Sequence, residues 1–204
     1  MPRRGRPRSL TESQIVEAAL ELSGRASLED ISMRELAGQL GVPVMTLYNY
    51  VASKDALHVL VLDHVLRPVA IPSPSAGPWD ERIRQLERDA RRAMAKHPGL
   101  SLMRHGLESS EAARLTDGVA SILADGGFSP DDTARAVAAL FALTLGQLEI
   151  DAIAVTSGAA VEASFETATG PAQLSRDELF DFGLDVVIEG LRAMIAKKSG
   201  RPRR

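Results

Sequence analysis

The segment over residues 43–50 carries side chains whose chemistry matches the edges of base pairs. Val44 and Met45 offer methyl groups of the kind that pack against thymine, while Thr46 and Asn49 can hydrogen-bond base edges or phosphate oxygens. Leu47 occupies a position expected to pack inward. The pattern therefore predicts an outward face composed of Pro43, Val44, Met45, Thr46, Asn49 and Tyr50.

Two short helices must position this face. A capping box that starts at Ser32 predicts a helix over 32–40, which Gly41 ends, and another at Thr11 predicts an earlier helix over 12–24. Pro43 suits the first position of the next helix, and Ser53 starts a fresh cap for the one after it. Two helices joined by a glycine-containing turn form a helix-turn-helix, whose second helix fits a major groove about 12 Å wide. The side chains expected to hold phosphates are Arg34, Tyr48 and Lys54.

The run SMRELAGQLGVPVMTLYNYVASKDAL, residues 32–57, resembles the helix-turn-helix of tetracycline-repressor (TetR) family regulators. It follows the pattern S-M-R-x-L-A-x-x-L-G-V-x-x-x-x-L-Y-x-x-V-x-x-K-x-x-L. The family most often has histidine where this chain has Tyr50. The resemblance implies that helix 55–66 carries movements to the DNA-binding helices. It also implies DNA-contacting positions at Arg34, Val44, Met45, Thr46, Tyr48, Tyr50 and Lys54. The alternative is a plain three-helix bundle in which Val44 and Met45 are core residues.

Basic segments lie at both ends of the chain. Residues 2–8, PRRGRPR, resemble an AT-hook, in which an extended backbone places arginines in a narrow minor groove. The arginines expected to do so are Arg3, Arg4, Arg6 and Arg8. The similar GRPRR at 200–204 reaches DNA only if the last helix points its end that way. A solvated charge run is the alternative for both.

Composition restricts the possible functions. The 204-residue chain has a net charge of −3, but residues 55–196 hold 21 acidic and 12 basic side chains, so DNA must be met by the N-terminal segment or the tails. The chain has no cysteine, which excludes disulfides and thiolate chemistry and is consistent with a cytoplasmic protein. No run of about 18 consecutive apolar residues is present, which predicts no membrane association.

The C-terminal half is expected to be helical, to bind a ligand and to form dimers. Proline-rich 67–78 reads as a linker, and helices are expected over 79–97, 108–125, 129–154 and 176–197, with a loop over 156–174. The two last helices are apolar around most of their circumference, which predicts a two-fold homodimer built on a four-helix bundle. The expected division is a flexible basic arm (1–9), a helix-turn-helix domain (10–54), a connecting helix (55–66), a linker (67–78), a ligand-binding and dimerisation domain (79–198) and a basic tail (199–204).

A mostly apolar effector pocket is expected among the middle helices. The candidate lining residues are Trp79, Leu86, Met94, Leu100, Met103, Leu107, Phe141 and Leu145. Leucine and methionine at helical spacing are more often core, which is the alternative for each of them. In tetracycline-binding members of the family, a histidine and a glutamate meet a drug-chelated magnesium ion in the regions where this chain has His105 and Glu149. No metal ligand set and no cofactor are otherwise predicted.

These features predict an all-α protein that represses transcription. A homodimer would bind a palindromic operator in double-stranded DNA and be released by a small-molecule effector. One alternative is an architectural protein that binds A·T-rich DNA through its arginine tails. A small helical enzyme is the other, but the chain has no G-x-G-x-x-G, G-x-S-x-G or H-E-x-x-H motif.

Overall fold

The computed structural model describes residues 10–23, 28–97, 100–157 and 175–199. Within these ranges every regular element is helical, which confirms the all-α prediction. The N-terminal elements are α1 (Glu12–Ser23), the 3-10 turn η1 (Leu28–Asp30), α2 (Met33–Leu40), α3 (Val44–Tyr48) and α4 (Lys54–Leu66). They are followed by η2 (Pro74–Ala76), α5 (Trp79–Ala95), α6 (Leu102–His105), α7 (Ser110–Asp125), α8 (Pro130–Ser157) and α10 (Arg176–Ser199).

Short-range capping interactions define the N-terminal helices, as the sequence predicts. The Ser32 backbone N–H donates to Glu35 Oε2 at 2.8 Å, and the Glu35 N–H donates to Ser32 Oγ at 3.2 Å. Gly41 then ends α2 in the left-handed conformation with φ of 68°, which glycine adopts without steric cost. One detail of the prediction is wrong. Pro43 caps α3 rather than forming its first residue, because its ψ of 142° is extended and not helical.

The segment 67–78 is irregular except for η2, but it is packed against the bundle. Val69 is buried, and Arg114 Nη2 of α7 donates to its carbonyl oxygen at 2.9 Å. Arg82 Nε of α5 donates to the Pro72 carbonyl at 3.1 Å. These contacts explain why a proline-rich stretch with no helical period nevertheless has a defined path.

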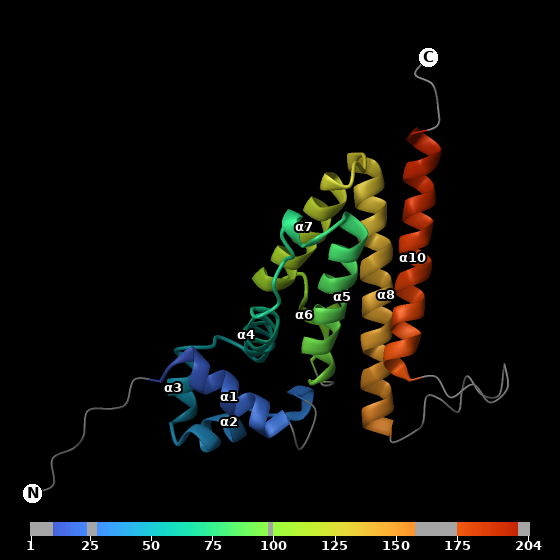
Figure 1. Ribbon diagram of the computed structural model, residues 1–204. Helices are drawn as coiled ribbons and strands as arrows, with labels where there is room; N and C mark the ends of the chain where they lie inside the picture. Colours follow the sequence, from blue (N-terminus) through green and yellow to red (C-terminus); the bar gives the residue numbers. More distant parts are fainter. Residues whose placement is uncertain (1–9, 24–27, 98–99, 158–174, 200–204) are drawn as a thin grey trace, which may run out of the picture.

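The C-terminal helices form a bundle beside the N-terminal ones. α8 and α10 run side by side, and α5 and α7 pack on α8 from the other side (Figure 1). Helices α1 to α3 gather at one end of the molecule, and α4 lies between them and the bundle, in contact with α1, α5, α6 and α7. Outside α3, the predicted helix boundaries hold to within two or three residues. Of the loop predicted over 156–174, residues 156–157 instead belong to α8, and 158–174 lie outside the described residues.

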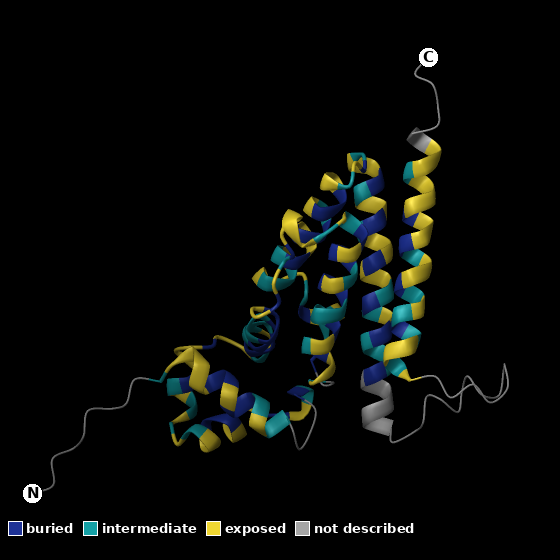
Figure 2. Ribbon diagram, in the orientation of Figure 1, coloured by how far each residue is buried: buried dark blue, intermediate teal, exposed yellow. Residues whose placement is uncertain are grey.

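The outer sides of α8 and α10 are exposed and rich in apolar residues (Figure 2). Phe182 is 70% exposed, and Phe141, Val186 and Met194 are also exposed. In the part of the chain that the structure describes, the segment Pro130–Asp151 is long and apolar enough to cross a membrane by length and composition, although only 22% of its 18-residue apolar stretch is buried. The segment contains no unbroken apolar run of that length, because Asp132, Arg135 and Glu149 interrupt it, and only its average hydropathy is high.

Candidate DNA-binding face and effector cavity

Helix α3 presents one side to the protein and the other to solvent. Leu47 is fully buried, whereas Met45 is 74% exposed, and Tyr48 and Tyr50 are also exposed. Asn49 caps the helix and is exposed, and Thr46 is half-buried. Such an exposed methionine on a short helix after a tight turn suits contact with a groove of DNA.

Val44 differs from its expected place. It is half-buried and packs against the core, so its methyl groups are only partly available to a base. The physical reason is its position at the first turn of α3, next to the buried side of α2. Met45 is therefore the apolar side chain that α3 exposes most.

The predicted phosphate-holding residues have different surroundings. Arg34 is exposed near the start of α2, where its guanidinium can reach solvent or a phosphate. Lys54 is half-buried, and its ammonium group donates to the Glu29 backbone carbonyl. Lys54 thus has an internal partner in the structure, which the sequence did not predict.

The basic segments fall largely outside the described residues. This applies to Arg3, Arg4, Arg6 and Arg8, and to the tail at 200–204. The direction of α10 is nevertheless clear, because the helix ends at the end of the bundle far from α1 to α3 (Figure 1).

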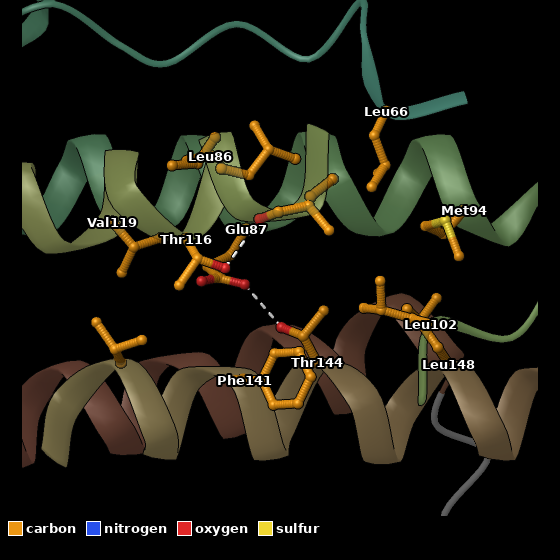
Figure 3. A pocket seen from close by; sticks show the side chains of 14 residues that line it. Leu66, Leu86, Glu87, Met94, Leu102, Thr116, Val119, Phe141, Thr144 and Leu148 are labelled. Atoms are coloured by element: carbon orange, nitrogen blue, oxygen red, sulfur yellow. Dashed lines mark hydrogen bonds between the residues drawn. The ribbon is translucent and has the colours of Figure 1, made fainter. Parts of the chain in front are cut away.

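A cavity of about 80 Å³ lies among α5, α7 and α8, closed at one end by residues of α4 and α6 (Figure 3). Its wall is mostly apolar, and the polar side chains in it are Glu87, Thr116 and Thr144. The remaining lining residues are Leu66, Leu86, Ala90, Met94, Leu102, Ala112, Leu115, Val119, Val137, Phe141 and Leu148. An apolar wall with a few convergent polar groups is the usual composition of a small-molecule site.

Glu87 is the chemically distinctive residue of this cavity. Its carboxyl group accepts a hydrogen bond from Thr144 Oγ1 at 2.7 Å (Figure 3). Burial raises the pKa of Glu87, and the Thr144 hydrogen bond opposes this only in part. The protonated form is therefore favoured, so Glu87 can donate a hydrogen bond to a ligand or ionise against a cationic one.

The Glu87 pKa predicts a pH-dependent stability. Because the folded pKa lies above the ordinary value of 4.5, stability is fully present below that value and is lost as pH rises through the folded pKa. The loss runs at up to about 1.4 kcal/mol per pH unit between the two pKa values. Glu87→Gln keeps the shape without the charge, so its free energy of unfolding, measured in urea, should fall less with rising pH than that of the parent protein. Exposed Glu108→Gln is the control, and an unchanged pH profile in Glu87→Gln would contradict the assignment.

Leu86, Met94 and Phe141 are the three predicted ligand residues that line the cavity. The other predicted residues do not line it. Trp79 packs edge-on against Phe128 with ring centroids 5.0 Å apart, Leu100 is core, and Met103 and Leu107 are exposed. Leu145 and Glu149 are half-buried on α8. His105 is buried and does not line the cavity, although Leu102, at the start of the same helix, does.

Glu87 was not among the residues predicted from the sequence, although its position on α5 carries a signal. Glu87 lies four residues after buried Ile83 and seven before buried Met94, so it falls on the apolar side of α5. A carboxylate at such a position is costly unless it is neutral or partnered, which makes it a candidate for function.

Helix α4 connects the cavity with the N-terminal helices. Its Leu66 lines the cavity, while its buried Leu57 belongs to the core that includes α1 and α2. Asp63 of α4 accepts hydrogen bonds from Ser110 Oγ at 2.8 Å and from the Glu111 backbone N–H at 3.1 Å at the start of α7. Although burial opposes it, these bonds and that of Ser109 hold the pKa of Asp63 below its usual range. Helix α4 thus contacts both the cavity and the helix-turn-helix.

A helix-turn-helix with an exposed second helix, joined by one helix to a bundle that encloses an apolar cavity, defines the class of one-component transcriptional regulators. Residues 71–170 match the family described as tetracyclin repressor-like, C-terminal domain. The HTH-type transcriptional repressor DrrR1 of Streptomyces coeruleorubidus is 27% identical over 226 residues, covering 98% of this chain and 83% of that protein. The chain belongs to the TetR family of transcriptional regulators.

Solved structures agree with this assignment. A possible TetR family transcriptional regulator from Streptomyces coelicolor A3(2) has a TM-score of 0.80 and 29% identity, covering 90% of this chain and 100% of that one. The Streptomyces coelicolor TetR family protein ActR, in complex with actinorhodin, has a TM-score of 0.73 and 26% identity, covering 90% and 97%. The overall architecture is therefore that of the family.

Proposed function

We propose that the protein is a ligand-responsive repressor that binds a palindromic operator as a homodimer and is released by a small-molecule effector. The observation that carries the proposal is α3, with Leu47 fully buried and Met45 exposed on a helix of helix-turn-helix geometry. Two relatives support the proposal. DrrR1 is named a transcriptional repressor, and ActR has been solved in complex with the small molecule actinorhodin. Such a regulator acts on DNA in the cytoplasm and needs neither a cofactor nor a membrane.

The homodimer forms through the outer sides of α8 and α10. Phe182 and Val186 on α10 are large apolar side chains that the single chain leaves exposed, and the exposed side of α8 carries Ala138, Ala139 and Ala142. A second copy of the chain, related by a two-fold axis, covers these side chains. Helices α8 and α10 of the two subunits then pack as a four-helix bundle. The same covering explains why α8 is apolar enough to resemble a membrane span while most of that segment is unburied.

The effector is a largely apolar molecule with one polar group directed at Glu87. The cavity wall offers Leu86, Met94 and Phe141 for the apolar part and Glu87 with Thr144 for the polar one. Binding in the cavity shifts α4 through Leu66 and changes the spacing of the two helix-turn-helix units. A coupling of about 1–3 kcal/mol is typical, and DNA must weaken effector binding by the same factor.

Substitutions on the helix-turn-helix test the DNA-binding face. Met45→Ala should relax base preference at one or two positions per half-site, by about 1–3 kcal/mol at most, because it removes a base contact. Arg34→Ala should weaken binding to all DNA sequences by the same factor, because it removes a phosphate contact. The measurement is the dissociation constant for the parent operator and its single-base variants, at one fixed salt concentration.

Two outcomes would contradict this face. An equal loss on every sequence with Met45→Ala would mean that α3 does not read bases. Loss of all binding on deletion of residues 1–8 would favour an architectural protein that relies on its arginine arm, whereas the proposal expects only weaker binding from that deletion.

A further inference from the structure

Three potential metal ligands meet where the N-terminal helices contact α6. Glu29 comes from η1, His58 from α4 and His105 from the end of α6, and the two histidines are only 2% exposed. His58 Nδ1 lies 2.8 Å from His105 Nε2, and Glu29 Oε1 lies 3.6 Å and 3.7 Å from these two nitrogens. None of the three residues lines the effector cavity.

The hydrogen bonds around His58 direct a lone pair into this cluster. His58 Nε2 lies 3.3 Å from the Leu28 carbonyl oxygen, which can only accept, so Nε2 carries the ring proton and donates. Nδ1 is then the unprotonated nitrogen and faces His105. Metal-ligating histidines almost always use their second nitrogen to donate to a carbonyl or carboxylate in this way.

Glu29 is held so that one carboxylate oxygen faces the histidines. Arg104 Nη1 donates to Glu29 Oε2 at 3.1 Å, and the Lys54 ammonium group donates to the Glu29 backbone carbonyl. Arg104 thus holds the carboxylate through Oε2, and Lys54 holds the backbone of the same residue. Glu29 Oε1 faces His58 and His105.

The separations match the size of a transition-metal site. Tetrahedral zinc bonds of about 2.0–2.1 Å place neighbouring donor atoms about 3.3 Å apart. The three separations here are 2.8, 3.6 and 3.7 Å, so on binding the two histidine nitrogens move apart and Glu29 Oε1 moves closer, each by about half an ångström or less. Two histidines and one glutamate leave a fourth tetrahedral position for water or another ligand. Imidazole nitrogens favour zinc and its neighbours in the first transition row over magnesium or calcium.

We propose that Glu29, His58 and His105 bind a divalent transition metal of the zinc class and that the bound ion fixes η1 and α4 against α6. On binding, His105 takes the tautomer with its proton on Nδ1, and the metal replaces the hydrogen bond between the two rings. Because α4 also connects the cavity with the helix-turn-helix, occupancy changes operator affinity. This last consequence rests on the proposed function, but metal binding itself does not.

Cobalt and zinc titrations of the full chain without an affinity tag test the site. Co²⁺ should give the visible absorption of a tetrahedral ion at one equivalent per chain, and Zn²⁺ should displace it. His58→Gln, His105→Gln and Glu29→Gln should each weaken Co²⁺ binding at least tenfold. His64→Gln, on the same helix as His58 but outside the cluster, is the matched control and should bind like the parent.

The design separates loss of the site from loss of the fold. Thermal unfolding in the presence of a chelator shows whether each variant folds, and added Zn²⁺ should raise the unfolding midpoint of the parent and of His64→Gln alone. Absence of a one-equivalent tetrahedral Co²⁺ signal overturns the proposal, as does equal binding by folded Glu29→Gln and the parent. Operator affinity is measured separately, with and without Zn²⁺, so that failure of DNA binding is distinguished from failure of metal binding.

Discussion

Replacing Leu47 with alanine should lower the free energy of unfolding of the N-terminal helices by about 2–5 kcal/mol and abolish operator binding. Leu47 is fully buried, and it is the one residue of α3 that the structure places wholly in the core. A helix of five residues has no stability of its own in water, so α3 depends on this packing for its position. Urea unfolding and operator titration of the same sample measure the two effects.

Met45→Ala is the matched control for Leu47→Ala. The two residues lie on the same helix, but Met45 is exposed, so its loss should change stability by less than about 0.5 kcal/mol. If both variants lost equal stability, the inward and outward sides of α3 would be assigned incorrectly.

Replacing Arg91 with alanine should destabilise the bundle by about 3–5 kcal/mol. Arg91 Nη2 of α5 donates to Asp151 on α8 at 3.1 Å, and Nη1 donates to Asp177 on α10. Its guanidinium also lies over the Phe180 ring, 5.1 Å from the centroid. Arg91 and Asp151 are both buried, so the variant leaves a buried carboxylate without its principal cation.

Arg88→Ala is the control for Arg91→Ala. Arg88 is one turn earlier on α5 and pairs with Asp181 at 2.8 Å, but these side chains are 37% and 42% exposed. Solvent screens such a pair, and its loss should cost no more than about 1 kcal/mol. Chemical denaturation of both variants measures their free energies of unfolding. A similar small decrease in each would show that the buried interactions of Arg91 add no more stability than an exposed ion pair.

The fold was largely predictable because the residues that start and end its helices act through local interactions. Ser32, Gly41 and Ser53 act through hydrogen bonds and backbone angles a few residues away, so the sequence alone locates the ends of α2 and α4. The outward Met45 and inward Leu47 follow from helical periodicity in the same way. Val44 was misplaced because its exposure depends on how closely α3 packs against α2, which periodicity does not specify.

The cavity and the histidine cluster depend on distant parts of the chain. Glu87 and Thr144 are 57 residues apart, and His58 and His105 are 47 apart, so no local pattern brings them together. Most predicted ligand residues were apolar positions chosen by periodicity, which does not distinguish a core contact such as Leu100 from a cavity wall such as Leu86. Lys54 illustrates the same limit, since its Glu29 partner comes from a turn that precedes α2.

Selection of binding sequences by the full chain from a random pool of DNA duplexes tests most directly whether a dimer reads a palindromic operator. A two-fold dimer presents two copies of α3 one helical turn apart, so we expect an enriched palindrome with two inverted half-sites about 10–10.5 base pairs apart. Enrichment of A·T-rich duplexes without inverted repeats, or of no sequence at all, would contradict it.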